Sequence, residues 1–559
     1  VASGFASVNI GNYGLQRYEL GYRTPLVKDK LYFGAAGMYS QRDGYYTNDF
    51  NNKSFDDIKS FAGNYYLKYI ASPRWSVTLN AKHQNNRNNG AFPMVSNVDE
   101  ALTNPWHLNQ NAVAEMKDNT FNTSLSVVHN GTGFNFTSQT AYQSNRRVYD
   151  APLDGDFSPI DGVSIINDYG GKWNKVKVFT QEFKFTSPTG SSSPFKWTAG
   201  TYFFHQDNPV KQATRFGEDA ALVGAPETNF STINTSTGKN TGFAVYGQGT
   251  YSITSRFDVI AGIRFDTEKK SLSVLGEYQK DPNPDPVFET RPDTSASANF
   301  TAFSPKLGIA YKANNHTNLF LTYSRGFRTG GLTPLAQGGD PSQPPLYPFD
   351  PEYSDNFELG IKNTFLRNML RINVSFFASR VTDAQIPTLI LPDAVTITRN
   401  AGKLSTKGAE IEIAANVVKG LEIDYSLGIT DAVYKDLKIS SNGSEEDLSG
   451  NRQIFTPGST SMLAMQYSTV PFKIAVPFSI VVRGEWQRIG KQYFDLANNI
   501  SQPSFNLVNA KGGFSSKNYE LMFWWRNIGG KRYIAYAYDF GAAHLGNPET
   551  LGVTLSAKF

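Results

Sequence analysis

The side chains that could carry catalysis or hold a metal ion are scattered along this chain of 559 residues. The DGD segment at 154–156 lacks the remaining carboxylates of an EF-hand loop. The absence of cysteine excludes disulfides, zinc–thiolate sites and iron–sulfur clusters. No local motif assembles a Ser, a His and an acid for acyl transfer. The chain has six histidines without an H-E-x-x-H motif or a close pair: His83, His107, His129, His205, His316 and His544. We therefore expect no catalytic residues, no metal site and no cofactor.

Two arginines, Arg147 and Arg328, are the candidates for binding an anionic ligand, because guanidinium groups make strong charge-assisted hydrogen bonds. Trp106 and His107, in a segment with loop character, are candidates for aromatic contact with the same ligand. The alternative for the arginines is that they only line a wet interior. For the two rings it is an interfacial belt or packing within the loop.

A third group, Arg483, Glu485 and Gln487, recurs at every second position of a segment that begins near Phe478. In an extended strand such residues share one face. We expect this face to solvate an interior or to contact a domain inside it.

The elements that position these residues are strands with one apolar and one polar face. In segment 256–266, Phe257, Ile263 and Phe265 share a face, whereas Arg264 and Asp266 lie on the other. The chain also ends on such a strand, 551–559, with an aromatic as its last residue. A one-residue slip would turn the charges outward, so the register is strongly specified. This pattern is typical of barrels with lipid outside and water inside.

Short and long connections between these strands alternate. The short ones are at 26–30, 71–74, 131–133, 187–194, 253–256, 313–316, 366–369, 417–420, 469–477 and 516–518. The long ones include 42–57, 87–117, 150–171, 207–239, 278–298, 329–351 and 434–456. Tight periplasmic turns and extended external loops show this asymmetry. The sequence predicts an all-β, transmembrane, antiparallel up-and-down barrel of roughly 22 strands, with both termini periplasmic.

Composition supports the same class. The mean hydropathy is −0.39 and no run of apolar residues is long enough to span a bilayer as a helix. Aromatic residues make up 14% of the chain, as expected where rings anchor a barrel at both interfaces. A net charge of +4 gives no reason to expect nucleic acid as a partner.

Several sequence blocks, taken in order, resemble the barrel of TonB-dependent outer-membrane receptors. They are TGFAVYGQGTYSITSRFDVIAGIRFDTEKK at 241–270, FSPKLGIAYK at 303–312, NLFLTYSRGFRTGG at 318–331, EYSDNFELGIKNTF at 352–365, NAGKLSTKGAEIEI at 400–413, RNIGGKRYIAYAY at 526–538 and the terminal LGVTLSAKF. The resemblance covers nearly the whole chain. It implies a Gram-negative outer membrane, energised import of a scarce solute such as a ferric siderophore, and a TonB-type energy-transducing protein as partner. Arg147 and Arg328 would then attract an anionic ferric chelate.

The front of the chain departs from this family, because we find neither a signal peptide nor the N-terminal plug domain. We interpret residues 1–559 as one outer-membrane β-barrel domain whose plug is missing or separate. A lumen closed by ~22 strands is too wide for side chains alone to fill, which motivates a plug. Two rival functions remain open, which are a passive porin and a barrel platform for a surface lipoprotein or a secretion or assembly complex.

Overall fold

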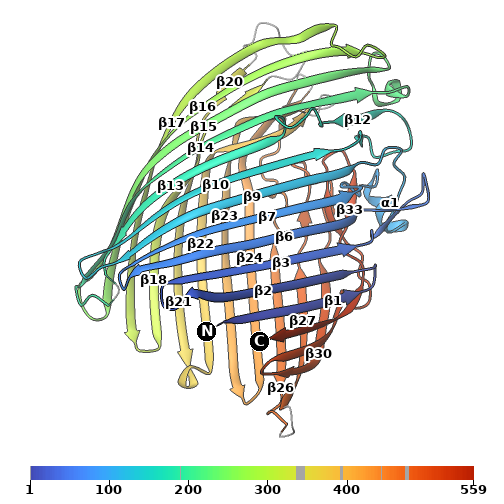
Figure 1. Cartoon of the computed structure of the whole chain (residues 1–559). Helices are drawn as coiled ribbons and strands as arrows, with labels where there is room; N and C mark the ends of the chain where they lie inside the picture. Colours follow the sequence, from blue (N-terminus) through green and yellow to red (C-terminus); the bar gives the residue numbers. More distant parts are fainter. Residues whose placement is uncertain (1, 189, 335–345, 391–394, 442–443, 473–476) are drawn as a thin grey trace.

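The computed structural model describes residues 2–188, 190–334, 346–390, 395–441, 444–472 and 477–559. Its main sheet holds 25 strands, of which β11 (Leu153–Asp154), β12 (Val163–Ile166) and β25 (Ser444–Asp447) belong to loops. The other 22 strands form the wall of a closed antiparallel barrel (Figure 1). The predicted fold class is thus confirmed.

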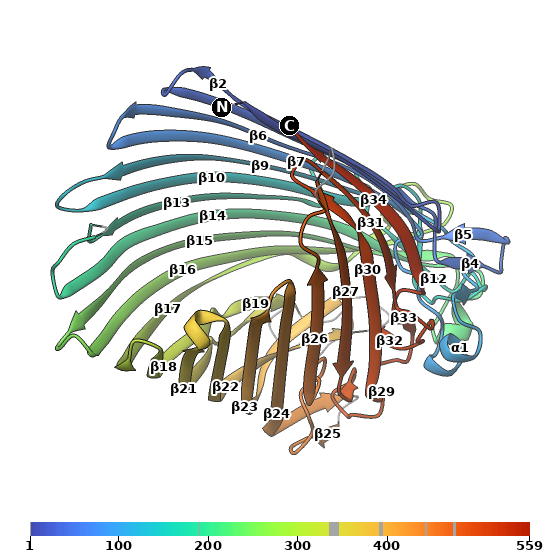
Figure 2. The same cartoon turned by 90° about the horizontal axis from the view of Figure 1, so that it is seen from below.

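The first half of the wall consists of β1 (Ser3–Gly11), β2 (Gln16–Val27), β3 (Leu31–Arg42), β6 (Asp57–Ser72), β7 (Trp75–Asn89), β9 (Glu115–Asn130), β10 (Asn135–Tyr149), β13 (Lys175–Thr186), β14 (Phe195–Phe216), β15 (Phe230–Ser252) and β16 (Phe257–Lys280). The second half consists of β17 (Phe288–Asn314), β18 (Thr317–Arg328), β21 (Glu352–Phe365), β22 (Leu370–Ile390), β23 (Val395–Val418), β24 (Leu421–Ser441), β26 (Ser459–Ser468), β27 (Phe478–Ile489), β30 (Phe505–Ser516), β31 (Tyr519–Arg526) and β34 (Thr550–Lys558). Each strand pairs with its neighbours in chain order. The barrel closes where β1 pairs with β34, so the two chain ends lie side by side (Figures 1 and 2).

The loops contain the remaining short elements. They are β4 (Tyr46–Asn48), β5 (Lys53–Phe55), α1 (Val98–Thr103), β8 (His107–Leu108), η1 (Ala220–Val223), β19 (Gly331–Pro334), β20 (Leu346–Phe349), η2 (Leu366–Asn368), β28 (Gln492–Tyr493), β29 (Ser501–Gln502), β32 (Ile534–Ala537) and β33 (Ala543–Leu545). None of the helices in the described part of the chain is both long and apolar enough to cross a membrane.

The two faces of the wall follow the predicted alternation. On β15, Phe243 and Val245 are 46% and 47% exposed, whereas Ala244 between them is buried. Val245 pairs with Phe265 of β16, which is equally exposed, so the apolar band continues from strand to strand. Long runs of continuous pairing carry the period-two pattern around the wall, and local register shifts interrupt six of the ladders.

All ten predicted short turns join consecutive wall strands at one end of the barrel, the end where both chain termini lie. Positions 189 and 473–476, which fall in two of these turns, lie outside the described residues. Parts of the predicted long connections 329–351 and 434–456 also lie outside them.

Two predicted loops are largely strand. The sequence predicts connections over 207–239 and 278–298, but β14 continues to Phe216, β15 begins at Phe230 and β17 begins at Phe288. The β14–β15 ladder runs in unbroken register from Phe195↔Tyr251 to Phe216↔Phe230. Backbone hydrogen bonds sustain these hairpins beyond the apolar band, where the alternation that marks a membrane strand disappears. Near the β14–β15 tip, Ala213, Phe216, Phe230 and Ile233 are buried and β12 pairs with β14.

Candidate ligand-binding site at the barrel mouth

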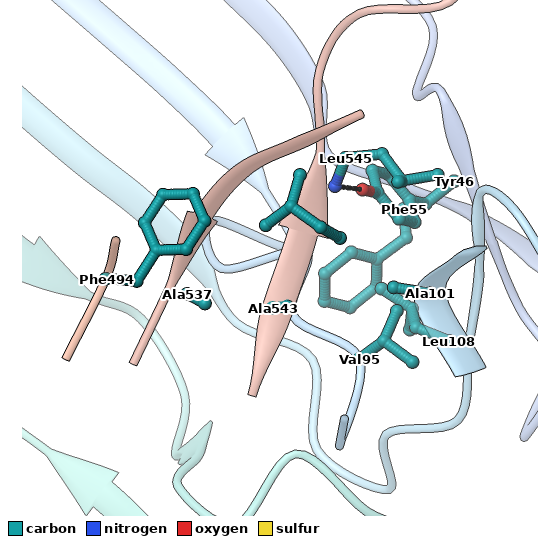
Figure 3. Close-up of a cluster of buried hydrophobic side chains, with 10 residues drawn as sticks. Tyr46, Phe55, Val95, Ala101, Leu108, Phe494, Ala537, Ala543 and Leu545 are labelled. Carbon is teal, nitrogen blue, oxygen red and sulfur yellow. Dashed lines mark hydrogen bonds between the residues drawn. The ribbon is translucent and has the colours of Figure 1, made fainter. Parts of the chain in front are cut away.

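The long loops converge over one end of the barrel and share a buried core, called here the loop cluster (Figure 3). It comprises Tyr46, Phe55, Val95, Ala101, Leu108, Phe494, Ile534, Ala537, Ala543 and Leu545. These side chains come from four connections that are far apart in sequence. The loops therefore form one packed layer around the mouth instead of separate flexible arms.

Buried polar groups fix how these loops meet. The Tyr46 hydroxyl accepts a 2.8 Å hydrogen bond from the Leu545 N–H, which links the first long loop to the last. The Asn48 amide donates to the Gln110 carbonyl at 2.8 Å, and the Gln110 N–H donates to Asn48 Oδ1 at 3.0 Å. Burial raises the pKa of the Tyr46 hydroxyl, so it stays neutral. Buried polar groups satisfied in this way specify one loop arrangement.

Trp106 and His107 belong to this layer. The Trp106 ring packs against the loop cluster, and its Nε1–H donates to the Gly546 carbonyl at 3.4 Å. The His107 ring lies 2.7 Å from Asp49 Oδ1 and keeps 42% of its side-chain area exposed. Both residues thus hold loops together at the mouth. Their predicted contact with a ligand stays a prediction.

Four aromatic side chains form a row along one side of the mouth, called here the aromatic row: Phe455, Tyr536, Tyr538 and Phe540. The Phe455 and Tyr536 rings stack with centroids 5.3 Å apart, and those of Tyr538 and Phe540 stack at 4.9 Å. The two pairs meet edge to face between Tyr536 and Tyr538 at 5.1 Å. Phe455 and Phe540 remain 43% and 45% exposed. The row is therefore a preformed apolar surface that a ring-bearing ligand could cover.

A cavity of about 810 Å³ opens beside the aromatic row. Loop and strand-end residues from β22, the β24–β26 connection and two later loops line it, including Phe455, Tyr536 and Tyr538. Glu446, Asp495 and Asp539 add carboxylates to its lining. No motif in the sequence predicts this site. The alternating rings of the YIAYAYDF segment at 533–540 were the available signal, but they read equally well as a membrane strand.

Arg147 lies near the mouth end of β10 and pairs with Asp118 of β9. Its Nε and Nη2 donate to Asp118 Oδ2 at 3.0 and 2.8 Å, and Asn145 donates to Asp118 Oδ1 at 2.6 Å. Asp118 is buried, whereas 58% of the Arg147 side-chain area is exposed. The carboxylate orients the guanidinium and leaves part of it open to the mouth.

Arg328 is the last residue of β18, and its side chain is exposed. Among the described residues, no carboxylate forms an ion pair with it. Its carbonyl accepts a 3.4 Å hydrogen bond from Gln385 Nε2, which ties this strand end to β22. Five wall strands separate β10 from β18, so the structure does not bring Arg147 and Arg328 together.

The strand parity of Arg483, Glu485 and Gln487 is opposite to that of Val482, which is 55% exposed on the apolar face of β27. Arg483 Nε donates to Glu485 Oε1 at 2.7 Å. Arg483 and Glu485 thus form an ion pair within one strand.

The DGD segment at 154–156 lies in the β10–β13 connection and holds two neighbouring carboxyl groups, Asp154 and Asp156. Asp154 is almost fully buried, and its carboxylate accepts hydrogen bonds from the backbone N–H groups of Asn111 and Phe157. Burial and the neighbouring Asp156 raise the pKa of Asp154 to about 7. In the described part of the chain, no three His or acidic side chains gather as a metal site would require. Asp154 instead organises the loop that carries Phe157, whose ring stacks on Tyr538 of the aromatic row.

Comparison with known proteins places this geometry in one family. The TonB dependent receptor-like, beta-barrel family model matches residues 2–528. The pesticin receptor of Yersinia pestis is 22% identical over 326 residues, which is 56% of this chain and 43% of that receptor. The catecholate siderophore receptor Fiu of Escherichia coli K12 is 24% identical over 411 residues, 68% of this chain and 51% of Fiu. The chain thus spans about half the length of these relatives.

Solved structures share the fold. The ferric yersiniabactin uptake receptor FyuA from Yersinia pestis superposes with a TM-score of 0.82 at 17% identity, over 100% of this chain and 80% of FyuA. The siderophore receptor PiuA from Acinetobacter baumannii gives a TM-score of 0.76 at 15% identity, over 100% of this chain and 82% of PiuA. At such low identity these similarities establish the barrel architecture alone.

Proposed function

Because this chain belongs to the TonB-dependent receptor family of Gram-negative outer-membrane barrels, we propose that it imports a ferric siderophore across the outer membrane. The family consists of transport receptors and not of enzymes, and we propose that this chain likewise catalyses no reaction. One observation carries the proposal. A closed 22-strand barrel bears an aromatic-lined cavity of about 810 Å³ among the loops at its external mouth.

The chemistry of the mouth suits a chelate with aromatic iron-binding groups. Planar rings of the ligand would lie on the exposed faces of Phe455 and Phe540, where stacking adds to the burial of apolar area. Arg147 and Arg328 would attract the net negative charge of the complex from two sides of the mouth. Trp106 and His107 would contact the ligand from the loop layer.

An open lumen of ~22 strands would let other solutes leak through, so selective import requires a plug that closes it. We propose that a plug domain occupies the lumen and contacts inward charges such as Arg483 and Glu485. A TonB-type protein would then remodel the plug with energy drawn from the inner membrane.

The test is uptake of radiolabelled ferric siderophores by cells that produce R147A/R328A as their sole receptor. Each lost charge-assisted hydrogen bond is worth roughly 1.5–3 kcal/mol, so ligand affinity should fall by about tenfold or more. The loss should be largest at low salt, where the attraction is least screened. The matched control is K517A, which removes a cation from a turn at the opposite end of the barrel. Unchanged uptake in R147A/R328A would contradict a role of these two arginines in ligand binding.

The aromatic row has a separate test. Y538A/F540A should weaken binding of catecholate or phenolate chelates but leave binding of purely hydroxamate chelates less affected, because only the former offer rings for stacking. Equal effects on both classes would show that the row supports the loops and does not select the ligand.

A further inference from the structure

A band of uncharged polar side chains runs down the inner face of β7, β9 and β10. On these strands Leu79, Leu125 and Tyr142 are exposed on the apolar outer face, so residues of the opposite parity face the lumen. Cross-strand partners share a face, and the inward residues therefore form rows across the three strands. We call this band the polar track and define it, in order from the mouth, by Gln84, Asn122, Gln143, Ser124, Ser126 and Gln139.

The track carries little charge. On β7, β9 and β10, all of whose residues are described, the inward charges are Lys82 and the ion pair between Asp118 and Arg147. That ion pair lies at the mouth end, so the track begins at an arginine proposed to attract the ligand. Gln84 and Gln143 are exposed to the lumen. Their amides can exchange hydrogen bonds between water and a solute, because each such bond contributes only ~0.5–1.5 kcal/mol net.

The opposite side of the lumen is acidic. β23 and β24 lie half the circumference away from the polar track (Figure 2). Their inward faces, of opposite parity to the exposed Ile429, carry four carboxylates: Glu410, Glu412, Glu422 and Asp424. Among the described residues no cation forms an ion pair with any of the four. Neutral amides donate to two of them, from Asn373 to Glu412 at 3.2 Å and from Gln466 to Glu422 at 3.3 Å.

This polarity decides where a body inside the lumen is held most firmly. The inference rests on the proposed import function and on a plug in the lumen. Ion pairs between a plug and the acidic wall would form in a narrow, partly dehydrated gap, where Coulomb attraction is roughly four times stronger than in bulk water. Hydrogen bonds to the polar track are replaced by water at small net cost. Remodelling of the plug should therefore separate it from the polar track first.

We propose that the polar track is the path along which the solute crosses the barrel, between strands β7–β10 and a plug that stays held on the acidic side. The solute would pass from Arg147 to Gln143 and then to Gln139, in steps of four residues or ~13 Å along β10. Amides and hydroxyls offer donors and acceptors without a charge that would trap the solute. The carboxylates of β23 and β24 would repel an anionic chelate, which also favours the opposite wall.

The absence of cysteine allows the path to be tested by site-specific thiol labelling. S124C and S126C place a thiol on the polar track. The matched control S426C places one on the inward face of β24, beside Glu412. Cells that produce each variant of the complete receptor as sole receptor are treated with a small hydrophilic maleimide, with and without an iron(III) catecholate chelate. Each labelling rate is compared with that of the same variant without chelate, so differences in thiolate fraction cancel.

We expect the chelate to accelerate labelling of S124C and S126C by about tenfold and to leave S426C unchanged. A tenfold change corresponds to ~1.4 kcal/mol in the free energy of exposing the thiol. A protonophore should abolish the acceleration, because remodelling of the plug draws on the inner-membrane gradient. A bulky maleimide attached to S126C should then stop uptake of the radiolabelled chelate and leave its binding at the mouth unchanged.

The possible results separate the path from the import function. Equal acceleration at S126C and S426C would mean that the whole plug leaves the lumen, and acceleration at S426C alone would place the path on the acidic side. Either result overturns the proposal. Uptake without acceleration at S124C and S126C would overturn the path and leave import intact. Absence of uptake by the unaltered receptor would contradict import itself, and the path with it.

Discussion

At the residue scale, a few buried polar groups decide how the mouth is built. The side chains of Tyr46 and Asn48 satisfy backbone groups of loops distant in sequence, Leu545 and Gln110 respectively. The Gln110 side chain satisfies the carbonyls of Phe92 and Met94 within its own connection. Their hydrogen bonds lie inside an apolar cluster, where an unpaired partner would cost most. The geometry of the mouth therefore depends on residues that do not line the candidate cavity.

Replacing Tyr46 by phenylalanine should loosen the mouth. The change leaves the buried Leu545 N–H without its acceptor, at a cost of about 1–3 kcal/mol. Hydrogen–deuterium exchange should show faster exchange in residues 543–545 and 46–55, with the wall strands unchanged. Y45F is the control, because the Tyr45 hydroxyl makes no comparable bond among the described residues. Equal exchange in Y46F and the unaltered chain would contradict this role.

The β10–β13 loop should lose stability as the pH rises. Because the pKa of Asp154 is raised to about 7, the folded loop binds a proton that the unfolded loop releases near pH 4. Stability is therefore greatest below about pH 4 and falls as the pH rises to about 7.

Exchange of the Phe157 amide, compared between variants at each pH, checks this expectation. D154N should remove most of the pH slope. D156N should remove less, although burial also raises the pKa of Asp156. A slope that survives in D154N would place its origin elsewhere.

At the element scale, each wall strand combines a lipid face and a water face in one alternating sequence. The ladder between β15 and β16 keeps Val245 beside Phe265 and Ala244 beside Asp266, so each face continues onto the next strand. Above the apolar band the same strands continue as hairpins held by backbone bonds, and Phe230 of β15 and Tyr278 of β16 pack there against a buried cluster that includes Phe216.

A charge should be tolerated on one face of β15 and not on the other. V245K should destabilise the barrel by about 2–4 kcal/mol, because it puts an ammonium group in the lipid band. Q248K, on the inward face three residues away, should change stability by less than about 1 kcal/mol. Equilibrium folding in urea with lipid vesicles measures both, and similar losses would mean that Gln248 also faces lipid.

At the scale of the whole molecule, strand number sets the width of the lumen. A barrel of 22 strands encloses more space than its inward side chains can fill, so we expect a separate body to close the lumen. The loop cluster covers only the mouth.

Planar-bilayer recordings check this inference. The present 559 residues should conduct as a wide, steady pore, and the receptor with its plug in place should be closed. A closed state of the 559 residues alone would contradict the need for a plug, and an open state of the complete receptor would favour a passive porin.

The sequence by itself determined the barrel. Alternation in segments such as 256–266 reports which face is wet, and the spacing of turns reports the number of strands, because both are local consequences of backbone geometry. It also predicts an inward parity for Arg147. Only the tertiary structure decided that Asp118 orients Arg147, that Trp106 packs into the loop cluster and that Tyr536 joins a row with Phe455. These contacts join segments far apart in the chain, and loops carry no periodic signal from which their partners could be read.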